Sequence, residues 1–218
     1  MRYLIVLLMA AEAFAAAPPH LTEKQAAAAA IDANRAQLTA LSDEVWRYAE
    51  TALKETKSSK ALADFAEAKG FKVTRGVAGM PTAFVAEYGS GRPVIGIMGE
   101  YDALPGLSQK AEPSRAVIDP GAPGHGCGHN LFGVGSLGAA MAVKDLIASG
   151  KLHGTVKFFG TPAEEAVGGK LYMLREGVMN GVDVTGTFCM RPLTIDAQPA
   201  DSRMERSASV FMIDSPYR

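Results

Sequence analysis

The chain has 218 residues, of which 48% are hydrophobic and 21% charged, a composition typical of an ordinary globular protein. Its 22 basic and 23 acidic residues leave a net charge of −1. The sequence has neither a basic excess nor a basic run, so it gives no sign of a nucleic-acid partner. The length allows one domain, or one domain and part of another.

The first fifteen residues are arranged like a secretory signal peptide. Arg2 supplies a positive start, residues 3–9 are apolar, and Ala13 to Ala15 form a small-x-small cleavage site. The alternative is a membrane anchor, but the apolar run is far shorter than the roughly 20 residues that cross a bilayer. The sequence therefore predicts a secreted or periplasmic protein without stable membrane insertion, from which residues 1–15 are removed.

Helical and strand patterns alternate along the rest of the chain. Thr22 and Gln25 have the spacing of a capping box, which predicts that a helix begins at Thr22. The predicted helices cover residues 22–53, 59–69, 130–149 and 169–176, and the predicted strands cover residues 71–77, 82–88, 94–98, 155–159 and 182–188. This order predicts an α/β fold, a three-layer sandwich with a mostly parallel central sheet. In such sheets functional groups gather at the carboxyl ends of strands.

A glycine-rich segment, Gly124 to Asn130, contains a cysteine and a histidine two residues apart. In an extended backbone, Cys127 and His129 would point the same way, and thiolate and imidazole are both good ligands for zinc. The alternative is a glycine-rich turn with a buried cysteine and surface histidines. Cys127 could also pair with Cys189 in a disulfide, although a cysteine flanked by two histidines is better explained as a ligand.

Acidic residues follow two of the apolar strands. Glu164 and Glu165 come after the strand at 155–159, where one carboxylate could bind a metal and the other could take a proton from a metal-activated water. The alternative is an acidic pair at the start of a helix. Asp102 follows the strand at 94–98 and could orient a metal-bound histidine, or it could be an exposed turn residue.

Three stretches that contain these residues resemble one enzyme family when they are taken in order. They are GEYDALPGLSQ (residues 99–109), PGHGCGHNLFGVGSLGAA (residues 123–140) and GTPAEEAVGGKLYMLREGV (residues 160–178). They resemble the zinc aminoacylase/carboxypeptidase superfamily of metallo-amidohydrolases, metallopeptidase family twenty. The branch is that of aminobenzoyl-glutamate hydrolase and N-acyl-amino-acid amidohydrolase, and the resemblance covers roughly residues 22–188.

The resemblance implies a role for each of the motif residues. Cys127, His129 and Glu165 would be metal ligands, Glu164 the general base, and Asp102 the aspartate that supports the metal site. His125 and Glu100 receive no metal role. The implied reaction is hydrolysis of the amide bond of an N-acyl or aminobenzoyl amino acid or a short peptide. The implied cofactor is zinc or manganese, with two ions in the family and one or none here.

The resemblance also implies parts that this sequence does not show. Residues 16–188 correspond to the N-terminal portion of the catalytic domain, whereas relatives continue into a lid or dimerisation domain that carries the homodimer interface. Residues 189–218 are expected to be an unassigned tail, divergent or frameshifted, and Cys189 stands where relatives have a further histidine ligand. A second hypothesis is therefore a truncated, non-catalytic remnant that binds metal at most. A periplasmic binding module is a third hypothesis, and it leaves the glutamate pair unexplained.

Overall fold

The structure is a computed structural model, and it describes residues 21–187 of the chain. The predicted signal peptide and the tail at 189–218 lie outside the described residues. The elements are α1 (Leu21–Ala33), α2 (Arg35–Tyr48), α3 (Thr56–Ala68), β1 (Lys72–Arg75), the short 3₁₀ helix η1 (Val77–Gly79), β2 (Phe84–Ser90), β3 (Val94–Glu100), α4 (His129–Ala148), β4 (Gly154–Thr161), α5 (Gly169–Arg175) and β5 (Val184–Thr187).

The described strands form a five-stranded mixed sheet in the order β1-β2-β4-β3-β5. β3 pairs in parallel with both β4 and β5, whereas β2 pairs antiparallel with β1 and β4. Four of the five strands consequently run in one direction, and β2 opposes them. β3 and β4 lie side by side, and their register pairs Glu100 with Thr161, so their carboxyl ends reach the same edge.

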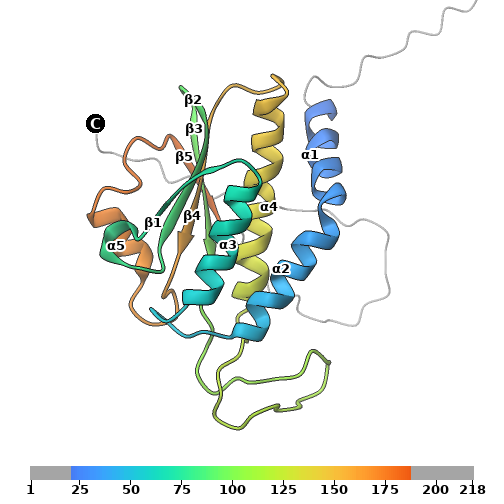
Figure 1. Ribbon diagram of the computed structural model, residues 1–218, viewed down its shortest axis with the longest axis vertical. Coiled ribbons are helices and arrows are strands. Elements are labelled where there is room, and N and C mark those ends of the chain that lie inside the picture. Colours follow the sequence, from blue (N-terminus) through green and yellow to red (C-terminus); the bar gives the residue numbers. More distant parts are fainter. Residues whose placement is uncertain (1–20, 188–218) are drawn as a thin grey trace, which may run out of the picture.

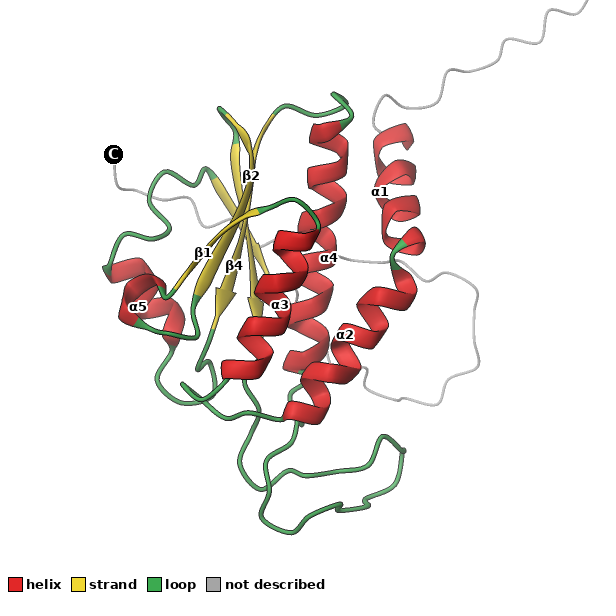
Figure 2. Ribbon diagram, in the orientation of Figure 1, coloured by secondary structure: helices red, strands yellow, loops and turns green. Residues whose placement is uncertain are grey.

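Helices cover both faces of the sheet, which gives the predicted three-layer α/β architecture (Figures 1 and 2). α2, α3 and α4 pack on one face against Phe84, Val156 and Phe158. On the other face Phe159 packs with Met173 of α5. Neighbouring residues of β4 thus face opposite layers, which explains why this strand is apolar along almost its whole length.

The N-terminal helical region differs from its prediction. The helix predicted over residues 22–53 is two helices separated at Asn34, whose side-chain amide donates to the carbonyl of Ala30. The capping box is wrong as well, because α1 already includes Leu21 and the Thr22 hydroxyl donates to the neighbouring Glu23 carboxylate. The Thr22 side chain thus bonds to its neighbour rather than to the backbone of the helix end, as a capping box would require.

Helix α4 lies in the core between the sheet and the helices α1 and α2. Among the described helices it is the one long and apolar enough to cross a membrane, yet 56% of its apolar window is buried inside the protein. It approaches β3 closely at Gly133, where an added Cβ would lie 2.5 Å from the Glu100 carbonyl oxygen. A glycine is therefore needed at this position to bring the N-terminus of α4 against the end of β3.

Candidate metal centre

The N-terminus of α4 and the segment after β3 meet through a buried histidine and a buried aspartate. The His129 Nδ1 lies 2.9 Å from both the Asp102 Oδ1 and the Asp102 carbonyl oxygen. Both oxygens can only accept hydrogen bonds, so Nδ1 carries the proton and Nε2 is left to face the acidic cluster. Asp102 holds the ring in this orientation, and a carboxylate that supports a ligand histidine would make the same contact.

Cys127 and Glu165 lie beside the exposed side of this imidazole. One ligand atom from each of Cys127, His129 and Glu165 lies within 4.8 Å of the other two. The predicted reason for this proximity is wrong, because the segment is not extended. Gly128 has φ +87°, a left-handed conformation that begins α4, and this turn sets the two side chains next to each other.

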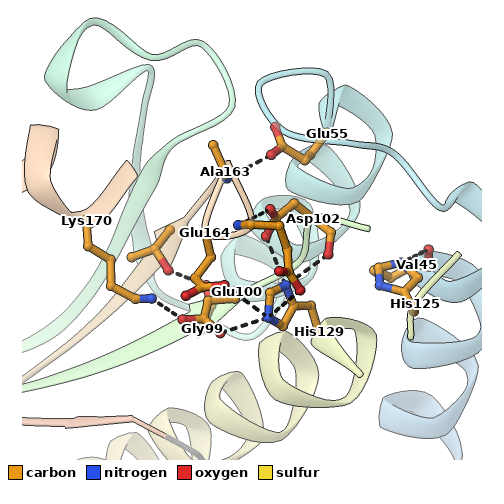
Figure 3. Close-up of polar contacts among 12 residues, drawn as sticks. Val45, Glu55, Gly99, Glu100, Asp102, His125, His129, Ala163, Glu164 and Lys170 are labelled. Carbon is orange, nitrogen blue, oxygen red and sulfur yellow. Dashed lines mark hydrogen bonds and ion pairs between the residues drawn. The ribbon is translucent and has the colours of Figure 1, made fainter. Parts of the chain in front are cut away.

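The acidic cluster contains two more carboxylates besides Glu165. The His129 Nε2 lies 3.2 Å from Glu100 and 3.8 Å from each of Glu164 and Glu165. The Glu164 side chain is 41% exposed, whereas that of Glu165 is mostly buried. Glu164 is therefore the carboxylate of the pair that solvent and a small molecule can reach. Figure 3 shows the side chains of Glu100, Asp102 and Glu164 around His129.

The electrostatics of the cluster favour a cation. Desolvation and the carboxylates of Glu165, Glu164 and Glu100 raise the pKa of the Cys127 thiol to about 11. Burial alone would lower the pKa of His129. The hydrogen bond to Asp102 and the nearby carboxylates together outweigh burial, so the pKa lies above its usual 6.5. The negative field thus makes both groups harder to deprotonate, and a bound metal ion is the kind of charge that displaces such protons.

Asp102 titrates in the opposite direction to Cys127 and His129. Burial alone would raise the pKa of Asp102. Hydrogen bonds from His129 and from the backbone N–H of Glu165 together outweigh burial, so the pKa lies below its usual value. Glu165 N lies 2.9 Å from the Asp102 Oδ2. Asp102 thus remains ionised and connects the ligand histidine to the glutamate pair.

The residues present fit a divalent metal ion. The Glu165 Oε1 atom is buried without a hydrogen-bond partner in the described part of the chain, although an unpaired buried carboxylate oxygen is costly. It belongs to the same cluster as the Cys127 thiol and the His129 imidazole. Sulfur, nitrogen and oxygen donors of this kind are the set that zinc binds in proteins.

Three polar residues around the site were not predicted from the sequence. Lys170 of α5 forms an ion pair with Glu100, and Glu55 binds the loop that carries the glutamate pair. Glu100 and Asp102 are two residues apart at the end of a strand, a spacing that could have drawn attention to Glu100. His125, which received no metal role, donates from Nε2 to the Val45 carbonyl of α2 at 3.1 Å.

Comparison with known proteins links the chain to a peptidase family. The model of the peptidase family M20/M25/M40 matches residues 96–202. The chain is 46% identical over 160 residues to one component of the p-aminobenzoyl-glutamate hydrolase of Escherichia coli, a match that covers 73% of this chain and 33% of that protein. It is 33% identical over 136 residues to the N-acetylcysteine deacetylase of Bacillus subtilis, covering 61% of this chain and 34% of the relative.

Solved structures agree with this placement. A dinuclear metal-binding peptidase of the M20 family from Bacillus subtilis superposes with a TM-score of 0.61 at 29% identity, covering 73% of this chain and 44% of that one. The chain spans about a third of the length of the curated relatives named above. Together with the fold and the Cys-His-Glu cluster, these matches show that the chain carries a peptidase M20 domain, and that its described residues have an α/β fold like that of M20 peptidase catalytic domains.

Proposed function

We propose that this protein is a metal-dependent amidohydrolase in which Cys127, His129 and Glu165 bind a divalent ion and Glu164 is the general base. The observation that carries the proposal is the convergence of these three donor atoms, with an unpaired buried oxygen on Glu165. Asp102 fixes the His129 tautomer that leaves Nε2 free to bind. The similarity to M20 hydrolases supports the reaction class.

Glu164 has the placement that a general base requires. A bound divalent ion would polarise the amide carbonyl and lower the pKa of a water molecule at the site. The Glu164 carboxylate, half-exposed beside the buried Glu165, takes the proton from the attacking water and passes it to the leaving nitrogen. Asp102 holds the backbone N–H of Glu165 and so fixes the pair relative to His129.

The substrate class follows from the relatives. The Escherichia coli relative belongs to a p-aminobenzoyl-glutamate hydrolase and the Bacillus subtilis relative is an N-acetylcysteine deacetylase. Both names describe hydrolysis at an amide nitrogen of an amino-acid derivative. We therefore propose N-acyl or aminobenzoyl amino acids, or short peptides, as substrates, with zinc or manganese as the metal.

Metal binding is the first experiment. The metal-free full chain is titrated with Co²⁺, and a thiolate-to-cobalt charge-transfer band is expected in the wild-type protein. The band is expected to vanish in Cys127→Ser, whereas Cys189→Ser serves as the matched control and keeps it. Loss of the band in Cys189→Ser with its retention in Cys127→Ser would contradict the assigned ligand set.

Turnover is the second experiment. The zinc- and manganese-loaded chain is assayed with p-aminobenzoyl-glutamate and with N-acetyl amino acids by following release of the free amino acid. Glu164→Gln is expected to abolish release while metal affinity is retained. Robust turnover in Glu164→Gln would refute the role of Glu164. Tight metal binding without turnover by the wild type would favour the second hypothesis, a metal-binding chain without activity.

We also propose export of the protein, from the pattern of residues 1–15. N-terminal sequencing of the protein recovered from the periplasm or medium is expected to start near Ala16. Recovery of the intact N-terminus from the cytoplasm alone would contradict export.

A further inference from the structure

The loop that carries Glu164 and Glu165 contains a strained residue. Ala163 has φ +58° and is fully buried. A left-handed conformation costs a residue with a side chain about 1–2 kcal/mol, so the surrounding structure must impose it. The carbonyl of Ala163 accepts from Gly168 N at 2.9 Å, and its N–H donates to the side chain of Glu55 at 2.9 Å.

Glu55 lies 108 residues earlier in the chain, directly before α3. Its side chain is completely buried, and its Oε1 accepts from both Ala163 N and Leu53 N. Its Oε2 has no hydrogen-bond partner among the described residues. A buried carboxylate with one free oxygen is costly, and it is the group that binds the amide of the strained residue.

Glu55 occupies the N-cap position of α3 but does not cap that helix. Glu50 takes over this role, because its carboxylate accepts from Lys57 N at 3.0 Å and from Ser58 N at 2.8 Å. The side chain of Glu55 is therefore free to point away from its own helix. Figure 3 shows it directed at Ala163.

We propose that Glu55 is a positioning residue for the catalytic loop. Together with Asp102 it holds alternate amides of the loop, those of Ala163 and Glu165, and so fixes the direction of Glu164 and Glu165 between them. The inference rests on the proposed function where it concerns metal binding. The placement of the loop is independent of it and is measured without metal.

The first test is backbone amide exchange in the metal-free full chain, followed by NMR. The measured quantity is the ratio of the exchange rate of the Glu165 amide to that of the Phe158 amide in β4, which reports global opening. In Glu55→Ala this ratio is expected to rise on the order of tenfold. Glu55→Gln keeps an oxygen acceptor for Ala163 N and is expected to restore slow exchange. Leu146→Ala, a core truncation at the other end of α4, controls for lost stability and is expected to leave the ratio unchanged.

The second test is Zn²⁺ affinity, measured by chelator competition. Glu55→Ala is expected to weaken binding about 10- to 100-fold, as for other groups that orient ligands, and Glu55→Gln to retain it. An unchanged Glu165 exchange ratio in Glu55→Ala would overturn the inference, as would an equal rise in Leu146→Ala. If Glu55→Ala does not fold, fast exchange in the Glu55→Gln variant overturns it instead. Failure of the wild type to bind Zn²⁺ would count against the proposed function and leave the exchange result decisive for Glu55.

Discussion

Asp102 and Glu55 are two buried carboxylates that approach the glutamate loop from different regions of the molecule. Asp102 uses both oxygens, one for His129 and one for Glu165 N, and its pKa lies below the usual value. Glu55 uses one oxygen, and desolvation raises its pKa despite its backbone hydrogen bonds and the nearby Thr82 hydroxyl. Hydrogen bonds thus outweigh burial at Asp102, whereas burial outweighs them at Glu55.

The difference indicates different contributions to folding. Asp102 stabilises both the fold and the site, because its charge is compensated by neighbouring donors. Glu55 maintains a loop conformation at a cost in stability, which is a pattern typical of residues retained for a functional site. Variants of the two regions should therefore behave differently.

Replacement of Asp102 should have the largest effect. Asp102→Ala leaves Glu165 N without an acceptor and His129 Nδ1 with only the main-chain carbonyl of residue 102. A buried unpaired donor costs about 1–3 kcal/mol and a hydrogen bond to a charged group contributes about 1.5–3 kcal/mol, so a loss of about 2–5 kcal/mol in unfolding free energy is expected. Urea unfolding with a chelator present measures this loss. The exposed Asp119→Ala is the control, expected to stay within about 0.5 kcal/mol of wild type. Equal losses in the two variants would contradict the structural role of Asp102.

A methyl group at Gly133 should disturb the region around Asp102 and leave the region around Glu55 intact. In Gly133→Ala the new Cβ would lie 2.5 Å from the Glu100 carbonyl oxygen, which forces α4 away from the segment holding Asp102. A loss of about 1–3 kcal/mol is expected, as for other overpacked cores, with the Glu55 contact retained. Gly135→Ala is the matched control, because no atom lies within 4 Å of its Cβ, and it should gain up to about 1 kcal/mol. Thermal unfolding ranks the two variants, and equal stability would contradict the close approach.

The sequence could predict the layers of this fold and the order of its strands along the chain, because apolar runs such as residues 155–159 mark buried strands directly. It could also predict that Asp102, His129 and the glutamate pair lie close together, because two neighbouring strand ends and a short motif carry them. The break at Asn34 depends on a local side-chain bond to Ala30, which composition does not reveal.

Glu55 was beyond prediction for a different reason. In the sequence it lies between the two helices predicted over residues 22–53 and 59–69, and no motif marks it. Only the fold shows that Glu50 does the capping and that Glu55 meets Ala163. Contacts between residues 108 positions apart depend on topology, and no local pattern encodes them.

Removing Glu50 should have a smaller effect than changes at Asp102 or Gly133. Glu50→Ala takes the acceptor from Lys57 N and Ser58 N, and loss of a helix cap costs about 1–2 kcal/mol. Urea unfolding measures the loss. Glu67→Ala is the control, because its ion pair with Arg75 is exposed and should contribute less than about 1 kcal/mol. If Glu67→Ala cost as much as Glu50→Ala, the capping role of Glu50 would be wrong.

The smallest effect is a pH dependence that distinguishes the two carboxylates. The folded-state pKa of Glu55 lies above its usual 4.5, so its ionisation favours the unfolded state, and stability is lost as pH rises from 4.5 through the folded value. Glu55→Gln removes that loss and should gain on wild type as pH rises. Asp102 has the opposite sign, because its folded pKa lies below 3.8 and its stabilisation is lost as pH falls through that lower value. Unfolding free energies of wild type, Glu55→Gln and Asp102→Asn are measured in chelator from about pH 2 to about pH 8, a range that includes the titration of both carboxylates. A difference between Glu55→Gln and wild type that stays constant over this range would show that burial does not penalise the Glu55 charge.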